Sequence, residues 1–150
     1  MKRLLTLFIS VFLLAHLCFS QKNLQKRADD ALKSNEYTFA INNYKSLFSQ
    51  TENEDPNKPV IAYKIGYCYR HISSPLHAQL WFEKAIDLNY QDPIVYLYCA
   101  DAMRMNENFD KAISYYEKYH SLVPSDKKAD KGIESCKNAK KWIKNPTNYK

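Results

Sequence analysis

Cysteine and histidine are the side chains of this 150-residue chain whose spacing could support metal binding. The closest set is Cys68, His71 and His77, in which the first two are three residues apart and could share one face of a helix. Thiolate and imidazole both bind zinc, but a stable structural site needs four protein ligands, and no fourth is evident in the sequence. The pattern therefore favours a core cysteine beside surface histidines over a metal site, and we predict no cofactor.

The sequence shows no catalytic constellation. Gly66 and Gly132 are its two glycines, which leaves no Gly-rich loop to hold a phosphate. It also contains neither a nucleophile elbow nor the histidine pair of a metalloprotease helix, and no acid–base pair stands out. We therefore predict that the protein is not an enzyme.

Residues 1–20 have the layout of a secretory signal peptide. Two basic residues precede an apolar run, and Cys18 and Ser20 place small residues at the −3 and −1 positions of a cleavage after Ser20. The apolar run of about 14 residues is short of the ~20 that span a bilayer, which disfavours an uncleaved anchor. Lipidation of Cys18 is a weaker alternative, because the residue before it, Leu17, is large. We predict an exported, periplasmic protein and leave outer-membrane association open.

The predicted mature chain is mildly basic and retains an odd number of cysteines. Loss of residues 1–20 lowers the formal net charge from +6 to +4. Cys68, Cys99 and Cys136 remain, and three thiols cannot all pair internally. Each falls on an apolar helical face, so the sequence favours small buried thiols over a disulfide. Export also separates the protein from nucleic acid, which we exclude as a partner.

A repeat of 34 residues organises the rest of the chain. Ala78 and Phe82, in the stretch AQLWFEKA, are answered by Ala112 and Tyr116 in AISYYEKY. An earlier copy lies 38 residues upstream, at Ala40, and the polar segment 50–59 can absorb the four extra residues as a loop. Alternating small and large side chains allow antiparallel helices to pack closely. The pattern predicts helical hairpins, and about three of them are needed for an independent fold.

The period and its residue types resemble those of the tetratricopeptide repeat (TPR) family. The positions that match the family motif are Ile65, Gly66, Tyr69, Ala78, Phe82 and Ala85 in one repeat, and Cys99, Ala100, Met103, Ala112, Tyr116, Tyr119 and Pro124 in the next. The family's tryptophan is replaced by Ala62 and Tyr96, and its final alanine by Tyr119, so the last repeat is a divergent copy. The resemblance implies an all-α, right-handed solenoid of three hairpins with a C-terminal capping helix.

The expected layout places this TPR-like domain at residues 21–144, with hairpins at about 22–50, 59–89 and 92–122, a cap helix at 125–144 and a tail at 145–150. The cap helix carries a narrow apolar stripe of Ala129, Ile133, Cys136, Ala139 and Ile143. Lysines cover its other faces, as expected for the solvated end of a solenoid. The same lysines allow weak attraction to an anionic envelope surface.

A narrower similarity concerns the order of segments. A signal peptide, three repeats and a helix followed by NPTNYK resemble the N-terminal region of the Bacteroidetes OmpA-family envelope proteins, some of which serve type IX secretion and gliding. In those proteins a β-propeller and a peptidoglycan-binding domain follow. Here the chain stops at Lys150, so peptidoglycan binding is not carried over. Two alternatives stay open: a stand-alone repeat protein, or a truncated relative without independent activity.

The family resemblance also implies a binding surface, because the first helix of each TPR hairpin lines a concave groove. The residues at these positions are Tyr63, Tyr67, Arg70, Leu97, Tyr98, Asp101 and Arg104. Tyrosine and arginine are enriched at binding hot spots, although they also occur as ordinary amphipathic surface. The family's clamp for a terminal carboxylate is not reproduced, since Tyr63, Lys64 and Tyr67 stand at its positions. We predict a scaffold that binds an envelope protein partner through this groove.

Overall fold

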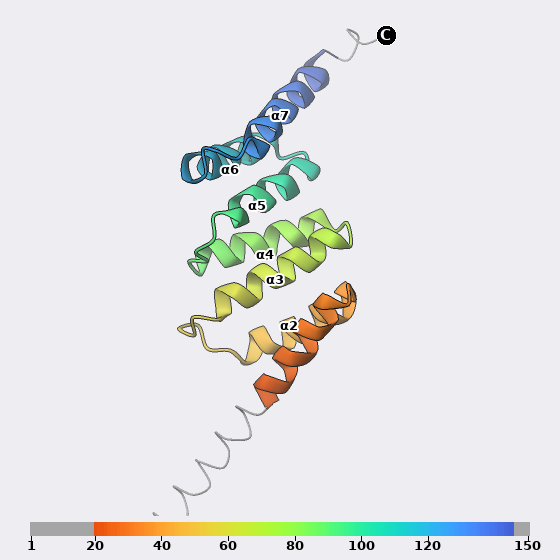
Figure 1. Ribbon diagram of the computed structural model, residues 1–150. Coiled ribbons are helices and arrows are strands. Elements are labelled where there is room, and N and C mark those ends of the chain that lie inside the picture. The colour runs from red at the N-terminus through yellow and green to blue at the C-terminus, as the bar shows by residue number, and fades with distance from the viewer. Residues whose placement is uncertain (1–19, 146–150) are drawn as a thin grey trace, which may run out of the picture.

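The computed structural model describes residues 20–145, and the regular structure in this range is entirely helical (Figure 1). The predicted signal peptide up to residue 19, with Cys18, and the tail from residue 146 lie outside the described residues. The helices are a first helix at 20–33, then α2 (Tyr37–Gln50), α3 (Lys58–His71), α4 (Pro75–Asp87), α5 (Ile94–Met105), α6 (Phe109–Leu122) and α7 (Lys128–Lys144). Within residues 20–145, none of these helices is long and apolar enough to cross a membrane.

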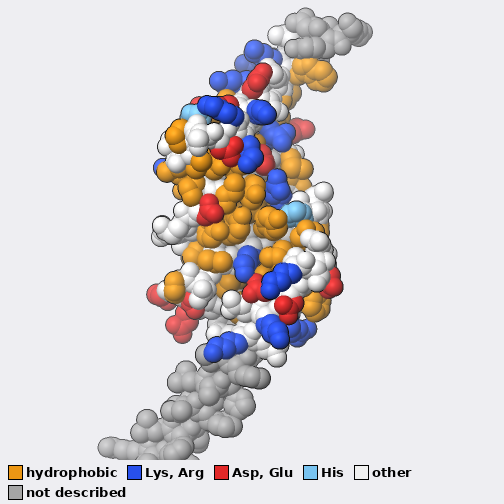
Figure 2. All heavy atoms as spheres, viewed as in Figure 1, with side chains coloured by type: hydrophobic (Ala, Val, Ile, Leu, Met, Phe, Trp, Pro, Cys, Tyr) orange, Lys and Arg blue, Asp and Glu red, His pale blue; other side chains and the backbone are white. Residues whose placement is uncertain are grey.

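The helices pair into three successive hairpins that stack on one another, with α7 against the last (Figure 1). One buried cluster, which includes Tyr44 and Ile65, joins the first hairpin to α3. A second cluster, which includes Phe82 and Tyr116, continues from α3 to α7. In Figure 2 hydrophobic side chains gather over the middle of one face, with most charged groups towards the two ends. The predicted all-α repeat solenoid is confirmed.

The repeated small residues lie where helices approach most closely. Ala78, Ala85, Ala100 and Ala112 are fully buried. A Cβ atom on Gly66 would lie 2.7 Å from Cδ1 of Phe82, which is tighter than real contacts allow. The predicted close approach at Gly66 is therefore present. Gly132 of α7 makes an equivalent approach to the ring of Tyr116, which the sequence pattern did not predict.

Four of the turns between helices share one backbone conformation. Each has a non-glycine residue with φ between 56° and 62°, namely Asn35, Ser73, Asn89 and Glu107. The next N–H bonds back over five residues, as in Ser74 to the carbonyl of Tyr69 at 3.0 Å. This is the pattern of a Schellman motif, which satisfies carbonyls left open at a helix end. Helix and turn therefore form one repeating unit.

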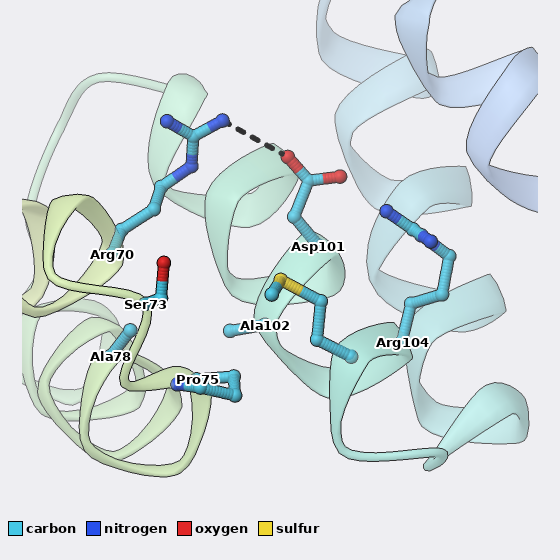
Figure 3. Close-up of a pocket in the computed structure, with 8 residues that line it drawn as sticks. Arg70, Ser73, Pro75, Ala78, Asp101, Ala102 and Arg104 are labelled. Carbon is cyan, nitrogen blue, oxygen red and sulfur yellow. Dashed lines mark ion pairs between the residues drawn. The ribbon is translucent and has the colours of Figure 1, made fainter.

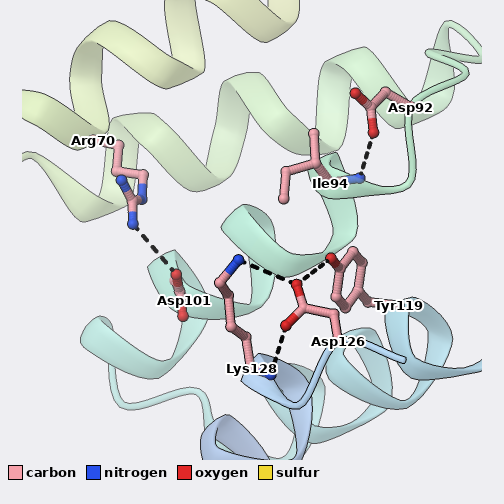
Figure 4. A network of polar contacts seen from close by, with 7 residues as sticks. All are labelled: Arg70, Asp92, Ile94, Asp101, Tyr119, Asp126 and Lys128. Carbon is pink, nitrogen blue, oxygen red and sulfur yellow. Dashed lines mark hydrogen bonds and ion pairs between the residues drawn. The ribbon is translucent and has the colours of Figure 1, made fainter. Parts of the chain in front are cut away.

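The starts of α4, α5 and α7 follow the proline and aspartate residues of the sequence. Pro75 is the first residue of α4, as predicted. Asp92 and Asp126 each accept a hydrogen bond of 3.0 Å from the N–H two residues later, at Ile94 and Lys128 (Figure 4). Both carboxylates therefore cap helix starts, although the helices begin slightly later than we predicted.

The segment between α2 and α3 is held by a lysine that the sequence analysis missed. Lys58 is 8% exposed, and its Nζ donates to the carbonyl of Thr51 at 2.5 Å and to Oδ1 of Asn53 at 2.9 Å. The same ammonium lies 4.8 Å from the ring centroid of Phe48. The inserted loop is thus fixed to the stack by a buried cation.

The apolar stripe predicted on the cap helix is only partly buried. Ala129 and Cys136 are buried, whereas Ile143 is 65% exposed, so its placement on the packed stripe was wrong. The reason is the length of α7. Lys140 already forms an ion pair with Asp110, near the beginning of α6, and the last turn of α7 extends past that helix (Figure 1).

Candidate functional site

The first helices of the second and third hairpins present most of the predicted groove residues at the surface. Tyr63, Tyr67 and Arg70 lie on α3, Tyr98, Asp101 and Arg104 lie on α5, and all six keep part of their side chain exposed.

Leu97 is the exception, and its assignment to the groove was wrong. It is 3% exposed and belongs to the same buried cluster as Ala129 and Cys136 of α7. Because α7 packs against α5 as well as α6, it covers the position that would face a groove in the middle of a longer solenoid. Leu97 therefore stabilises the cap rather than a partner.

Four tyrosines form a continuous set of rings, which we call the tyrosine cluster: Tyr63, Tyr67, Tyr90 and Tyr98. Tyr63 stacks on Tyr90 with 4.5 Å between ring centroids and lies 6.3 Å from Tyr67 and 6.4 Å from Tyr98. Burial, and then the neighbouring tyrosines, raise the pKa of Tyr63, so its hydroxyl stays protonated. The sequence analysis missed Tyr90 because it lies in the turn after α4, outside the repeat motif.

His71 extends this aromatic surface to the first hairpin. Its ring stacks on Tyr37 of α2 at 4.5 Å and lies 4.5 Å from Tyr67. Burial, and then Arg70, lower the pKa of His71, which favours the neutral imidazole.

The three residues considered as metal ligands do not come together. Cys68 is fully buried and His71 lies in the groove. His77 stacks on Tyr69 at 4.9 Å, and its Nδ1 is 2.9 Å from Oγ of Ser74. Among residues 20–145 no group of three histidine, cysteine or acidic side chains is placed to hold a metal ion. Cys68, Cys99 and Cys136 are free, buried thiols.

Two pockets open beside these rings. The arginine pocket, about 280 Å³, lies between the α3–α4 turn and α5 (Figure 3) and is lined by Arg70, Ser73, Pro75, Ala78, Asp101, Ala102, Arg104 and Met105. The aromatic pocket, about 380 Å³, lies one hairpin earlier and is lined by Leu32, Asn35, Tyr37, Tyr63, Lys64 and Tyr67.

The charged groups of the arginine pocket are connected to the core. Tyr116 donates a hydrogen bond of 2.7 Å to Oδ1 of Asp101 and accepts one of 3.3 Å from Nε of Arg104. Arg70 forms an ion pair of 3.6 Å with the other oxygen of Asp101 and lies 4.5 Å from the ring centroid of Tyr98 (Figures 3 and 4). The pocket thus contains two guanidinium groups and one carboxylate.

The cation of the aromatic pocket is neutralised more tightly. Lys64 Nζ lies 2.6 Å from Oδ1 of Asp29, which also accepts a 2.5 Å hydrogen bond from Tyr44. Burial of Asp29 opposes its ionisation, but the bonds from Lys64 and Tyr44 outweigh this and lower the pKa of Asp29. Apolar and aromatic groups therefore dominate the surface that this pocket offers.

Comparison with solved structures identifies the fold. No family model matches the chain, and no curated protein matches its sequence. The first TPR domain of Spaghetti (RPAP3), bound to an HSP90 peptide, is similar with a TM-score of 0.68 and 20% identity over 79% of this chain and 91% of that one. The second TPR domain of human RPAP3, in complex with an HSP70 peptide, gives 0.68 and 17% over 81% and 98%. The Arabidopsis OM64 TPR domain gives 0.67 and 13% over 79% and 95%. The protein has the fold of a TPR domain.

Proposed function

We propose that this protein is a non-catalytic scaffold that binds a segment of a partner protein along its groove. The observation that carries the proposal is the row of rings from Tyr37 through His71 and Tyr67 to Tyr98, which crosses all three hairpins without a break. Aromatic side chains that are half-buried before binding lose little conformational freedom on binding, and they offer a large contact area. Both RPAP3 domains of the same fold are seen with a bound peptide, which supports this use of the surface.

We further propose that the protein works in the periplasm, where its partner is an envelope protein. The charged, apolar and small-residue order of residues 1–20 supports export. The resemblance to the N-terminal region of OmpA-family envelope proteins suggests a partner among the type IX secretion or outer-membrane components. The exposed lysines of α7 suit a weak secondary contact with an anionic envelope surface.

A pull-down from envelope extract tests the scaffold role. The test variant is Tyr67→Ala/Arg70→Ala, which removes exposed groove groups. The matched control is Lys111→Ala/Lys118→Ala, which changes two exposed side chains of α6. We expect wild type and control to retain the same proteins and the groove variant to lose them, while all three give the same thermal melting curve. Equal retention by both variants would remove the groove from the proposal.

Localisation has a separate test. The full chain with a C-terminal tag is expressed, fractionated by osmotic shock and sequenced from its N-terminus. We expect a periplasmic product that begins at Gln21. Recovery of the unprocessed chain from the cytoplasm would contradict the export proposal and leave the groove proposal standing.

A further inference from the structure

The groove contains two chemically different subsites at equivalent positions of successive repeats. Three positions of the aromatic pocket, Leu32, Asn35 and Tyr37, recur 38 residues later as Arg70, Ser73 and Pro75 in the arginine pocket. The backbone therefore forms the same hollow twice, and only the side chains differ.

The difference between the two hollows is one of charge. In the aromatic pocket Lys64 is held 2.6 Å from Asp29, and the remaining lining is mostly aromatic or aliphatic. In the arginine pocket two guanidiniums share one carboxylate, and the ion pair between Arg70 and Asp101 is long at 3.6 Å. Arg70 is the more available of the two arginines, because Arg104 is bonded to Tyr116.

On this basis we propose the chemistry of the partner segment, an inference that rests on the proposed function. The segment carries an aromatic or large aliphatic side chain that enters the aromatic pocket beside Tyr37 and Tyr67. Towards the third hairpin it carries an aspartate or glutamate whose side-chain carboxylate pairs with Arg70 in the arginine pocket.

Physical chemistry favours this occupant in both places. A guanidinium binds a carboxylate through two parallel hydrogen bonds, a geometry that the 3.6 Å contact with Asp101 does not provide. The face of Tyr98, 4.5 Å from the guanidinium carbon, holds Arg70 in place for a second anion. In the aromatic pocket an apolar ring removes water from Tyr37 and Tyr67, whereas a second charge would meet an ion pair that is already complete.

A phage library of random peptides fused through their C-termini to the coat protein provides the probe, because its members have no free terminal carboxylate. Selection is carried out on the intact protein. Dominant peptides are then synthesised with an amidated C-terminus, and their affinity is measured by fluorescence anisotropy. For each peptide the acidic residue is changed to its amide and, separately, the large apolar residue to alanine.

We expect selected peptides to combine one acidic and one aromatic or large aliphatic residue in a fixed order. On wild-type protein the acid-to-amide change should weaken binding about tenfold, as expected for loss of a charged hydrogen-bonded pair. On Arg70→Gln the same change should have less than about a twofold effect, because the group that reads the charge is gone. The apolar-to-alanine change should show the same coupling with Tyr37→Ala.

Three results would overturn the inference. If peptides bind but tolerate the amide within about twofold, or if the charge effect persists unchanged in Arg70→Gln, the arginine pocket is not the acidic subsite while the scaffold role stands. Failure of the library to yield any peptide that binds would overturn the inference and the proposed function together. Should Arg70→Gln fold poorly, the amide comparison on wild type decides alone.

Discussion

The hydroxyl of Tyr116, a buried residue of the repeat motif, donates a hydrogen bond of 2.7 Å to Asp101 on the groove. The first hairpin repeats the relationship, because Tyr44 donates to Asp29 at 2.5 Å. In the second hairpin the equivalent motif position is Phe82, which has no hydroxyl, and the position that holds aspartate in the other two hairpins holds Tyr67. A tyrosine in the motif thus accompanies a carboxylate in the groove, so core and binding surface are chemically linked.

Tyr116→Phe tests this link. The substitution leaves Asp101 without its donor from the core and should lower the free energy of unfolding by about 1 kcal/mol. Urea unfolding followed by far-UV circular dichroism measures the change. Tyr115→Phe is the matched control: it removes a hydroxyl from the next residue of α6, where no hydrogen bond to that hydroxyl is present, and should change stability little. Equal effects of the two substitutions would show that the bond to Asp101 is not stabilising.

The sequence predicted the hairpins well because a 34-residue period of small and aromatic side chains is dictated by helix packing. Ala78, Phe82, Ala112 and Tyr116 are fully buried, as this argument requires. It could not predict which groove positions remain open. Leu97 is buried because a particular neighbour, α7, covers it, and that contact depends on where the solenoid ends.

The unpredicted residues share a physical reason. Lys58 lies in a polar segment, where solvent exposure is the default expectation, yet three groups of the loop and α2 surround its ammonium. Tyr90 lies in a turn and reaches Tyr63 only through the stacking of two hairpins. A repeat pattern describes each hairpin, whereas these contacts arise between segments that the pattern treats as variable.

Gly132→Ala tests how closely α7 packs. In an open helix the change to alanine would raise stability by about 0.5–1 kcal/mol. At Gly132 the new Cβ would lie 2.6 Å from Cε1 of Tyr116, so we expect a loss of about 1–3 kcal/mol instead. Thermal and urea unfolding measure the sign directly. Ser135→Ala, at an exposed position of the same helix, should give a small gain. A gain at both positions would contradict the packing described for α7.

Ser73→Gly and Glu107→Gly test the repeated turn. Both residues have a left-handed φ, 56° and 61°, which glycine adopts without the steric penalty of a side chain. Part of this gain is offset by the greater freedom of glycine in the unfolded chain, so each change should raise stability by about 0.5–1 kcal/mol. The melting temperature is the measurement. Ser114→Gly, in the middle of α6, should lower stability by a similar amount, and a loss in all three variants would refute the argument from φ.

The pH dependence of stability follows from Asp29. Its pKa lies below the ordinary value of 3.8 in the folded protein, because the bonds from Lys64 and Tyr44 outweigh the opposing effect of burial. A carboxyl whose folded pKa is depressed contributes stability that is fully present above the unfolded pKa and is lost as pH falls through the folded one.

Wild type should therefore be more stable than Asp29→Asn by about 1 kcal/mol near neutral pH, an amount typical of a partly exposed ion pair with an added hydrogen bond. The difference should shrink steadily below about pH 4, when Asp29 itself becomes protonated and loses the charge that Lys64 pairs with. Urea unfolding midpoints at a series of pH values measure this. Asp30→Asn, on the exposed face of the same helix, should stay close to wild type throughout, because the Asp30 side chain makes no ion pair. A pH-independent gap between wild type and Asp29→Asn would mean that the amide disturbs packing and that the charge of Asp29 contributes nothing to the fold.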